Sequence, residues 1–253
     1  MSQKLLDTET LDIHAGGRDL ILPHHENEIA QSEALTGKSF AKYWIHHGLL
    51  TINSQKMSKS LGNFITIRDF MDKFKNANLL KMFFLSAHYS HPIDYTQEKI
   101  AEARQALERI AILLDKVKNL NYQSASNKSI QEIEIVKEKF LNCMDDDFNT
   151  PEALACVFEL VTLANKHMND CEYICNADKA LNVFLGVLGI DFKQSNEHNI
   201  LADKEVEKLI NDRNNARRNK DFALADKIRK DLELKGIVLE DIKDKGTTWR
   251  RKL

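Results

Sequence analysis

Apolar residues recur every three or four positions between about residues 96 and 192. This spacing places apolar side chains along one face of an α-helix, where they can pack against other helices. Four separate stretches have the pattern, so we predict a helical bundle in this region. The stretches are IAEARQALERIAILLDKV, IEIVKEKFLNCM, PEALACVFELVTLANKHM and ALNVFLGVLGI.

The first 50 residues or so combine short β-like pieces with one helix-like run. LDIHAGG, RDLILP and YWIHHGLL are β-like, whereas HHENEIAQSEALTG has helical character. Pro23 is tolerated in the first turn of that helix, and Gly37 suits the position just past its end. Alternation of this kind predicts an α/β layer. Because so few residues cannot build a doubly wound sheet, we expect this domain to begin upstream of Met1.

The other segments are more polar. Residues 51 to 95 begin with the loop SQKMSKSLGN and continue with the amphipathic stretch FITIRDFMDKFKNANLLKMFFLSAHY. Residues 193 to 202 are typical of a linker, and two further helices are predicted before Gly236 and a β-like IVL. The whole pattern predicts a mostly α-helical chain with a small α/β part.

Composition excludes several classes of protein. The 253 residues are 43% hydrophobic, but no stretch approaches the roughly 18 apolar residues of a membrane span, and the first residues, MSQKLLDTET, lack the apolar core of a secretory signal. We therefore expect a cytoplasmic protein. The formal net charge is −2, yet residues 204 to 253 hold 15 Lys and Arg against 10 Asp and Glu, a local +5. A basic end favours a polyanion partner, although mixed charge runs are usually solvated helix faces.

Four cysteines occur in helix-like sequence, and they are too sparse for a disulfide framework. We expect Cys143, Cys156, Cys171 and Cys175 to serve in packing. The alternative is a metal pair at Cys171 and Cys175, which could share a helix face, but the sequence nearby offers no further ligand.

The first candidate site is PHHENE, residues 23 to 28. If a helix begins at Pro23, His24 and Glu28 lie four residues apart on one face, with their Cβ atoms about 5 to 6 Å apart. An imidazole and a carboxylate are both acceptable zinc ligands, but a catalytic site needs a third protein ligand, and the sequence shows no obvious one. The alternative is a histidine pair that caps or packs at a helix start.

Two further motifs have features of a nucleotide site. In HAGGRDL, Gly16 and Gly17 allow close approach of a ligand to the backbone, and Asp19 could accept hydrogen bonds from ribose, although such a sequence is often an ordinary turn. In KMSKS, Lys56 and Lys59 could reach a triphosphate and stabilise the charge that develops as pyrophosphate leaves.

Several blocks resemble cysteinyl-tRNA synthetase, a class I aminoacyl-tRNA synthetase, from Met1 to Lys252. They are DIHAGGRDLILPHHENEIAQSEA, KMSKSLGNF, SAHYSHPIDYT, MDDDFNTPEALA, RNNARRNKDFALADKIRKDL, GIVLED and GTTWRRK. The resemblance implies the end of a Rossmann-type catalytic domain, a helical bundle and a small anticodon-binding domain. The implied ranges are 1–50 for the zinc and adenylate side, 51–95 for the KMSKS loop and stem-contact region, 96–192 for a DALR-like bundle, and 203–253 for the anticodon-binding domain.

The resemblance also implies roles for individual residues. His24 and Glu28 would be two ligands of a zinc ion that binds the substrate thiolate, and His14 would lie near the cysteine pocket. ATP with Mg²⁺, or the adenylate, would be bound by Gly16, Gly17, Asp19 and Lys59, with Lys56 assisting in catalysis. Contacts to tRNA(Cys) would come from Arg213, Arg217, Arg218, Lys227, Arg229, Lys230, Trp249 and Arg250.

The family's HIGH motif and two zinc cysteines would lie upstream of HAGG, and this sequence does not contain them. We therefore predict that the isolated chain does not activate L-cysteine without the missing N-terminal half, and we expect a monomer. Two alternatives stay open. One is a non-catalytic fragment that only binds tRNA or a partner protein. The other is the cysteine ligase of mycothiol synthesis, against which the anticodon-type C-terminal block argues.

Overall fold

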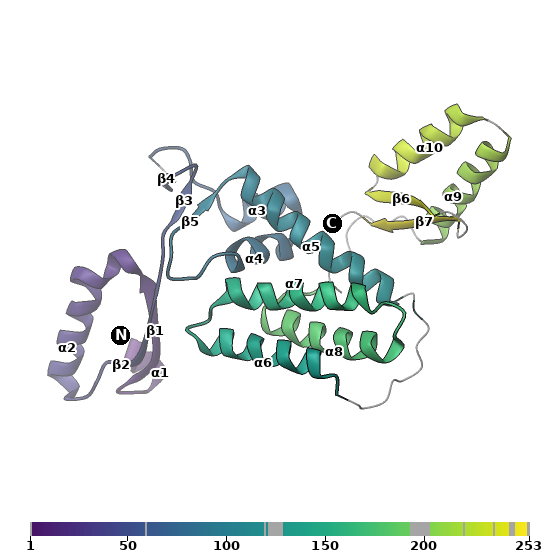
Figure 1. The fold of residues 1–253 in the computed structure, drawn as a ribbon. Coiled ribbons are helices and arrows are strands. Elements are labelled where there is room, and N and C mark those ends of the chain that lie inside the picture. The colour runs from purple at the N-terminus through teal and green to yellow at the C-terminus, as the bar shows by residue number, and fades with distance from the viewer. Residues whose placement is uncertain are drawn as a thin grey trace.

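The structure is a computed structural model that describes residues 2–58, 60–118, 120, 129–192, 203–219, 221–234, 236–242 and 246–251. Within these residues the chain is mostly helical, with three small sheets (Figure 1). None of the helices described combines the length and the apolar character needed to cross a bilayer. The mostly α-helical fold class predicted from the sequence is confirmed.

The N-terminal part is a two-stranded parallel sheet with helical elements between its strands. Strand β1 pairs with β2 from Leu11 opposite Ala41 to Gly17 opposite His47. In Figure 1 the long helix α2 lies alongside this sheet. The elements are α1 (Ser2–Leu6), β1 (Leu11–Gly17), η1 (Arg18–Leu20), η2 (Ile21–His25), α2 (Glu26–Thr36) and β2 (Ala41–His47).

One sequence-based prediction in this part is wrong. RDLILP is not β-like but forms the helical turns η1 and η2, with a kink at Leu22 (φ −120°, ψ 129°). Helix α2 accordingly begins at Glu26 rather than at Pro23. Its predicted end is confirmed, because Gly37 adopts a left-handed conformation (φ 66°) and donates its amide to the carbonyl of Glu33.

The KMSKS region contains a second small sheet and two helices. The strands are β3 (Leu50–Ile52), β4 (Gln55–Lys56) and β5 (Ile93–Tyr95), with β3 antiparallel to β4 and parallel to β5. Between them lie α3 (Ile67–Phe74) and α4 (Ala77–Leu85). Helix α3 begins where Thr66 and Asp69 bond each other's backbone amides, and α4 begins where the Asn76 side chain accepts the backbone amide of Leu79.

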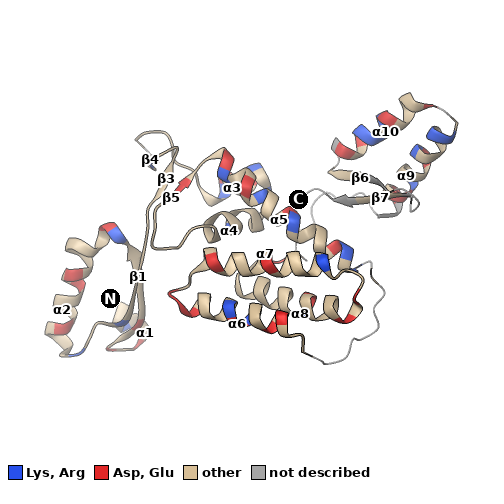
Figure 2. Cartoon of the chain, viewed as in Figure 1, with Lys and Arg blue, Asp and Glu red and all other residues tan. Residues whose placement is uncertain are grey.

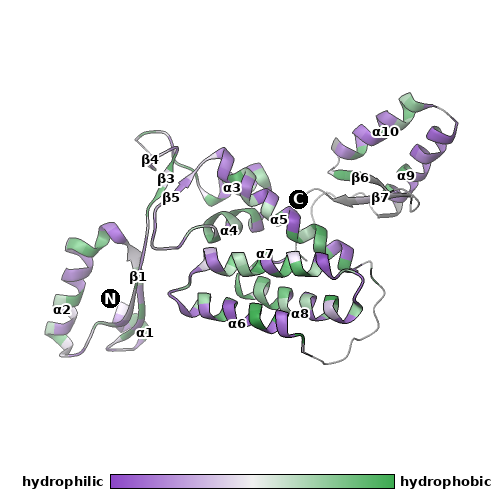
Figure 3. Ribbon diagram, in the orientation of Figure 1, coloured by the Kyte–Doolittle hydropathy of each residue, from purple (hydrophilic) through white to green (hydrophobic). Residues whose placement is uncertain are grey.

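The predicted helical bundle is confirmed. It consists of α5 (Gln97–Lys118), α6 (Gln131–Asp145), α7 (Thr150–Lys166) and α8 (Cys171–Val187). Leu107, Ile110, Leu160 and Ile174 are at most 1% exposed, and the rings of Phe140 and Phe184 stack with centroids 4.0 Å apart. Apolar and polar residues alternate along each of these helices in Figure 3, as expected when one face is buried.

The cysteines of the bundle are free thiols. Cys156 and Cys175 are buried, and Cys143 packs at the edge of the core, so the packing role is confirmed for these three. Burial raises the pKa of the Cys156 thiol to about 11. Cys171 is exposed at the start of α8, so the two cysteines of CEYIC do not share one environment.

The C-terminal part has its own core. It contains α9 (Asp203–Arg218), α10 (Phe222–Leu234) and an antiparallel hairpin of β6 (Ile237–Ile242) and β7 (Gly246–Arg251). The predicted helices and the strand after Gly236 are confirmed, whereas strand β7 was not anticipated. The predicted linker, residues 193–202, lies outside the described residues. The core consists of Val206, Ile210, Leu232, Ile237 and Leu239.

Candidate functional site

A carboxylate lies between two imidazoles beside the N-terminal sheet. Glu28 Oε2, from the first turn of α2, is 3.2 Å from His14 Nε2 on strand β1. Glu28 Oε1 is 3.7 Å from His24 Nε2, which is in η2 just before α2. The two residues that the sequence nominated as metal ligands, His24 and Glu28, therefore face each other, and His14 approaches the same carboxylate.

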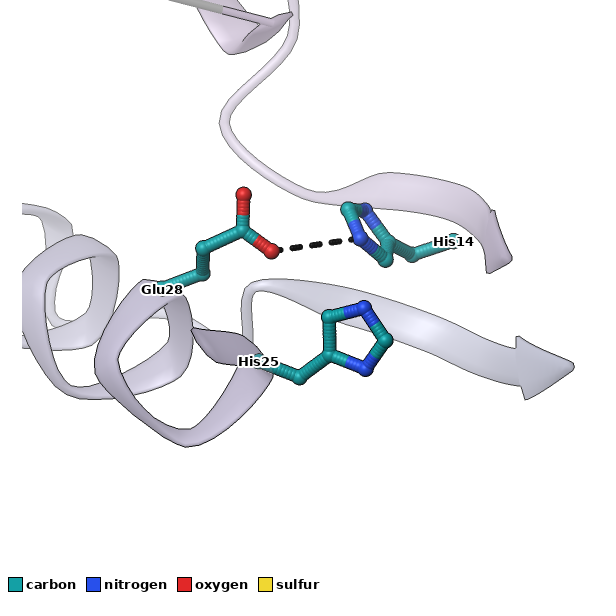
Figure 4. A group of neighbouring side chains, drawn as sticks. All are labelled: His14, His25 and Glu28. Atoms are coloured by element: carbon teal, nitrogen blue, oxygen red, sulfur yellow. Dashed lines mark ion pairs between the residues drawn. The ribbon is translucent and has the colours of Figure 1, made fainter. Parts of the chain in front are cut away.

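His25 is a member of this cluster that the sequence reasoning missed. It is 3% exposed, and its Nδ1 atom lies 2.9 Å from Nε2 of His46. Figure 4 shows the imidazoles of His25 and His14 on the side of Glu28 that faces the strands. Burial, followed by the nearby His46, lowers the pKa of His25, which favours the neutral imidazole that a metal requires. Its position directly after His24 was the only available signal.

These side chains fit a divalent cation. His14, His25 and Glu28 each offer a ligand atom, and these atoms lie within 4.8 Å of one another. Glu28 Oε2 is buried and makes no hydrogen bond of good geometry, although His14 Nε2 is near it. A buried carboxylate oxygen without a donor is costly, so a cation beside it would be stabilising. Neutral imidazole and carboxylate are ligands that zinc accepts.

Aromatic rings enclose the cluster on the strand side. The Trp44 ring lies 4.6 Å from the His14 ring and stacks on His46 at an interplanar angle of 13°. The Phe40 ring lies 5.3 Å from His14. The imidazoles of the cluster are thus fixed in orientation by packing, while the side chain of His24 is 59% exposed and marks the solvent side.

The glycine pair is explained in part by contacts within the chain. A Cβ atom on Gly16 would lie 2.7 Å from the His25 ring, so the absence of a side chain lets that ring pack against the strand. A Cβ atom on Gly17 would lie 2.5 Å from a carboxylate oxygen of Asp19. Asp19 itself is exposed at the start of η1. The adenylate-binding roles of these three residues stay predictions.

The KMSKS loop is closed by one asparagine. Asn63 Oδ1 accepts the amide of Ser58 at 2.9 Å, and its Nδ2 donates to the carbonyl of Lys56 at 3.1 Å. The side chain of Lys56 is exposed at the end of β4. Lys59 lies outside the described residues, so its predicted phosphate contact stays a prediction.

The basic residues of the C-terminal part fall into two groups. Arg217, Arg218, Lys227, Arg229 and Lys230 are exposed on α9 and α10, where Figure 2 shows basic and acidic residues interspersed. These five side chains are accessible to a polyanion.

Arg213 and Trp249 differ from that group. Arg213 is only 3% exposed and donates to Thr247 Oγ1 at 3.3 Å, so in this structure it stabilises the C-terminal part instead of offering a phosphate contact. Trp249 packs against the C-terminal core, so part of its ring is already used in packing. The side chain of Arg250 lies outside the described residues.

Three family models match the chain in succession. The class I (C) tRNA synthetase catalytic domain matches residues 1–105, the DALR domain matches 139–193, and the cysteinyl-tRNA ligase anticodon-binding domain matches 202–250. The chain is 46% identical over 261 residues to the cysteine–tRNA ligase of Geobacillus sp. (strain WCH70) and 43% identical over 258 residues to that of Clostridioides difficile (strain 630). Each alignment covers 99% of this chain. The chain belongs to the cysteinyl-tRNA synthetase family.

The chain spans about half the length of the curated synthetases that it matches, 54% and 55% for these two relatives. Its fold is similar to that in the crystal structure of the ternary LeuRS–tRNA–LeuAMS complex of Agrobacterium radiobacter K84 agnB2. That match has a TM-score of 0.56 at 16% identity and covers 69% of this chain and 25% of the other. This likeness concerns the fold alone, and membership of the cysteinyl-tRNA synthetase family rests on the sequence matches.

Proposed function

We propose that the chain is part of a cysteine–tRNA ligase, which activates L-cysteine with ATP and Mg²⁺ and transfers it to tRNA(Cys). The observation that carries this proposal is the Glu28 carboxylate between His14 and His24, beside the glycine turn of β1, in a chain that aligns over 99% of its length with ligases of this name. Charging of tRNA would take place in the cytoplasm. The complete enzyme would act as a monomer.

His24 and Glu28 would hold a zinc ion together with ligands from outside this chain. When bound, zinc supplies a preference for the cysteine thiolate over a serine hydroxyl. The residues of this chain orient that site. Trp44 fixes the His14 ring, Gly16 makes room for His25, and the packed rings limit access of water from the strand side.

Nucleotide binding would involve the strand end and the KMSKS loop. Gly16, Gly17 and Asp19 are proposed to hold the ATP or the adenylate, because a turn after a parallel strand lets phosphate and ribose approach the backbone. Lys56 and Lys59 are proposed to stabilise the negative charge on the departing pyrophosphate. The second proposal is supported by the exposure of Lys56 at the base of its loop.

A further polypeptide is proposed to cover the outer face of the N-terminal sheet. Ile13 and Tyr43 are opposite each other in the β1–β2 register and are 60% and 68% exposed. Parallel sheets are normally buried on both faces, so a two-stranded one with such an apolar pair is incomplete by itself. The remainder of the catalytic domain, which the longer relatives contain, is the occupant that fits.

Binding of tRNA is proposed for Arg217, Arg218, Lys227, Arg229 and Lys230, with Arg250 as an additional contact. Phosphate contacts by Lys and Arg release counterions, so affinity should fall as salt is added. Arg213 is left out of this set because it is buried.

Binding and activation by the isolated chain test this function together. We expect gel-shift binding to tRNA(Cys) that weakens steeply with salt, and cysteine-dependent ATP–pyrophosphate exchange at background. The variant Lys227→Ala/Arg229→Ala/Lys230→Ala should bind more weakly, whereas the control Lys137→Ala on the bundle should not. Salt-insensitive binding, or none, would count against tRNA as a ligand.

The alternative of a tRNA-binding fragment without catalysis is favoured by the exposed sheet face, and it concerns the isolated chain only. Restoring pyrophosphate exchange by adding the N-terminal half of a related ligase would show that the chain completes an active site and is more than a tRNA-binding fragment. Exchange clearly above background by the chain alone would contradict the proposed division of the active site.

A further inference from the structure

The loop between α4 and β5 lies between the N-terminal β1–β2 sheet and the helical bundle and contacts both. This connecting loop, residues 86–92 (SAHYSHP), forms hydrogen bonds to three other parts of the chain. These parts are the end of β2 at Gly48, the turn η1 at Arg18, and the α6–α7 turn at Asp147. In Figure 1 the α6–α7 turn lies on the side of the bundle that faces β1.

On the sheet side the fit is close. Gly48 donates its amide to the carbonyl of Tyr89 at 2.8 Å, and Arg18 Nη1 donates to the carbonyl of Ser90 at 3.3 Å. A Cβ atom on Gly48 would lie 2.1 Å from the carbonyl oxygen of His91, so only glycine permits this approach. Gly48 directly follows strand β2, which carries Trp44 and His46 of the candidate site.

On the bundle side Thr150 Oγ1 donates to the carbonyl of Ala87 at 3.5 Å, and the other contacts are made by Asp147. The Tyr89 hydroxyl donates to Asp147 Oδ1 at 2.7 Å, and His88 Nε2 lies 3.0 Å from the carbonyl oxygen of Asp147. The bond to this carboxylate is also the first cause of a raised pKa of Tyr89. Tyr89 is thus bonded to the sheet through its backbone and to the bundle through its side chain.

The α6–α7 turn has a backbone conformation that few residues adopt. Asp147 and Phe148 both have positive φ angles, 51° and 55°. Aspartate tolerates this region, but a bulky residue seldom occupies it, and such conformations persist only where the surroundings enforce them. The turn therefore presents Asp147 to the connecting loop at a cost in backbone energy.

We propose that Tyr89 is a positioning residue, which with Asp147 fixes the orientation of the site-bearing sheet relative to the helical bundle. This inference rests on the proposed function. A tRNA that reaches from the helical part to the sheet gains affinity from both contacts only if their relative orientation is held, because the second contact then forms at high effective concentration.

The test compares whole tRNA(Cys) with its two halves, an acceptor-stem minihelix and an anticodon stem-loop. The variants are Tyr89→Phe, which removes only the hydroxyl, and Asp147→Gly, which removes the side chain but keeps a residue suited to positive φ. We expect affinity for whole tRNA to fall about five- to tenfold, the loss associated with one ordinary intramolecular hydrogen bond. Affinity for each half should not change. Asp147→Asn, which keeps an acceptor oxygen and tolerates positive φ, should restore much of the affinity.

Tyr173→Phe is the matched control. Tyr173 donates to Glu132 Oε2 at 2.9 Å, at the beginning of α6, about 20 Å along the helix from Asp147. The Tyr173→Phe substitution removes the same hydroxyl group as Tyr89→Phe but leaves the contact between the connecting loop and Asp147 intact. Hydrogen exchange at the Gly48 amide should accelerate in Tyr89→Phe and stay unchanged in Tyr173→Phe.

Each other outcome contradicts the inference in a recognisable way. Equal losses for whole tRNA and for its halves would indicate a general loss of structure. Unchanged affinity for whole tRNA, together with unchanged exchange at Gly48, would show that the junction does not depend on Tyr89. Absence of tRNA binding by the unaltered chain would instead refute the proposed function itself.

Discussion

His14 on strand β1 and Glu28 on helix α2 lie with 3.2 Å between Nε2 and Oε2. The strand and the helix thus bring an imidazole and a carboxylate together beside His24, the residue that sequence spacing alone had paired with Glu28. The arrangement bears on metal binding.

Replacing Glu28 with Gln should weaken zinc binding. The amide removes the negative charge from the position that faces His14 and His24, so we expect affinity to fall at least about tenfold. Zinc titration against a chromophoric chelator measures it. Glu26→Gln, an exposed neighbour on the same helix, serves as the control. Equal zinc affinity of Glu28→Gln and the unaltered chain would refute a ligand role for this carboxylate.

Replacing Gly48 with Ala should destabilise the chain. The added methyl group would lie 2.1 Å from the His91 carbonyl oxygen, and overpacking of this kind costs on the order of 1–3 kcal/mol. Gly186→Ala in α8 is the opposite case, because nothing lies within 4 Å of the added atom, and alanine favours a helix by roughly 0.5–1 kcal/mol. Urea unfolding should therefore give changes of opposite sign, and a neutral Gly48→Ala would contradict the close approach.

Replacing Arg213 should affect stability, whereas replacing Lys227 should affect tRNA binding. Arg213→Ala removes a buried guanidinium that donates to Thr247, which should lower the stability of the C-terminal part by about 1–3 kcal/mol. Lys227 is exposed, so Lys227→Ala should leave stability unchanged and weaken tRNA binding. Thermal unfolding and gel-shift titration give the two readouts. If Arg213→Ala keeps full stability but loses tRNA affinity, Arg213 is a phosphate contact after all.

Part of the free energy of unfolding should be lost at acidic pH because Asp94 becomes protonated. Its carboxylate accepts Thr51 Oγ1 at 2.7 Å and the Ser54 amide at 2.8 Å, and these bonds hold the pKa of Asp94 below its ordinary value of 3.8. The unfolded chain then binds the proton more readily, so this contribution is present above pH 3.8 and is lost as the pH falls through the lowered pKa.

Carboxyl-carbon NMR titration measures the pKa of Asp94 directly. Asp94→Asn should also lose less stability than the unaltered chain between about pH 6 and about pH 3, since the ordinary aspartate pKa lies in that interval. A titration of Asp94 at or above 3.8 would contradict the hydrogen-bond assignment.

The local sequence pattern predicted secondary structure correctly where an element depends mainly on its own residues. The bundle helices follow from apolar spacing, and Gly37 and Gly236 end their helices because each adopts positive φ. The prediction for RDLILP was wrong because its conformation depends on the elements on either side of it. Its apolar residues suggested a strand, but the segment must turn from β1 into α2 within a few residues, and helical turns are the compact way to do so.

The sequence by itself determined the bundle helices, the helix ends before Gly37 and Gly236 and the pairing of His24 with Glu28, because these depend on residues close together along the chain. Only the tertiary structure decided that His25 packs against Gly16, that Arg213 is buried and that Tyr89 meets Asp147. Such contacts join elements that are distant along the chain. Their geometry depends on how strands and helices pack, and it cannot be predicted from the local spacing of residues.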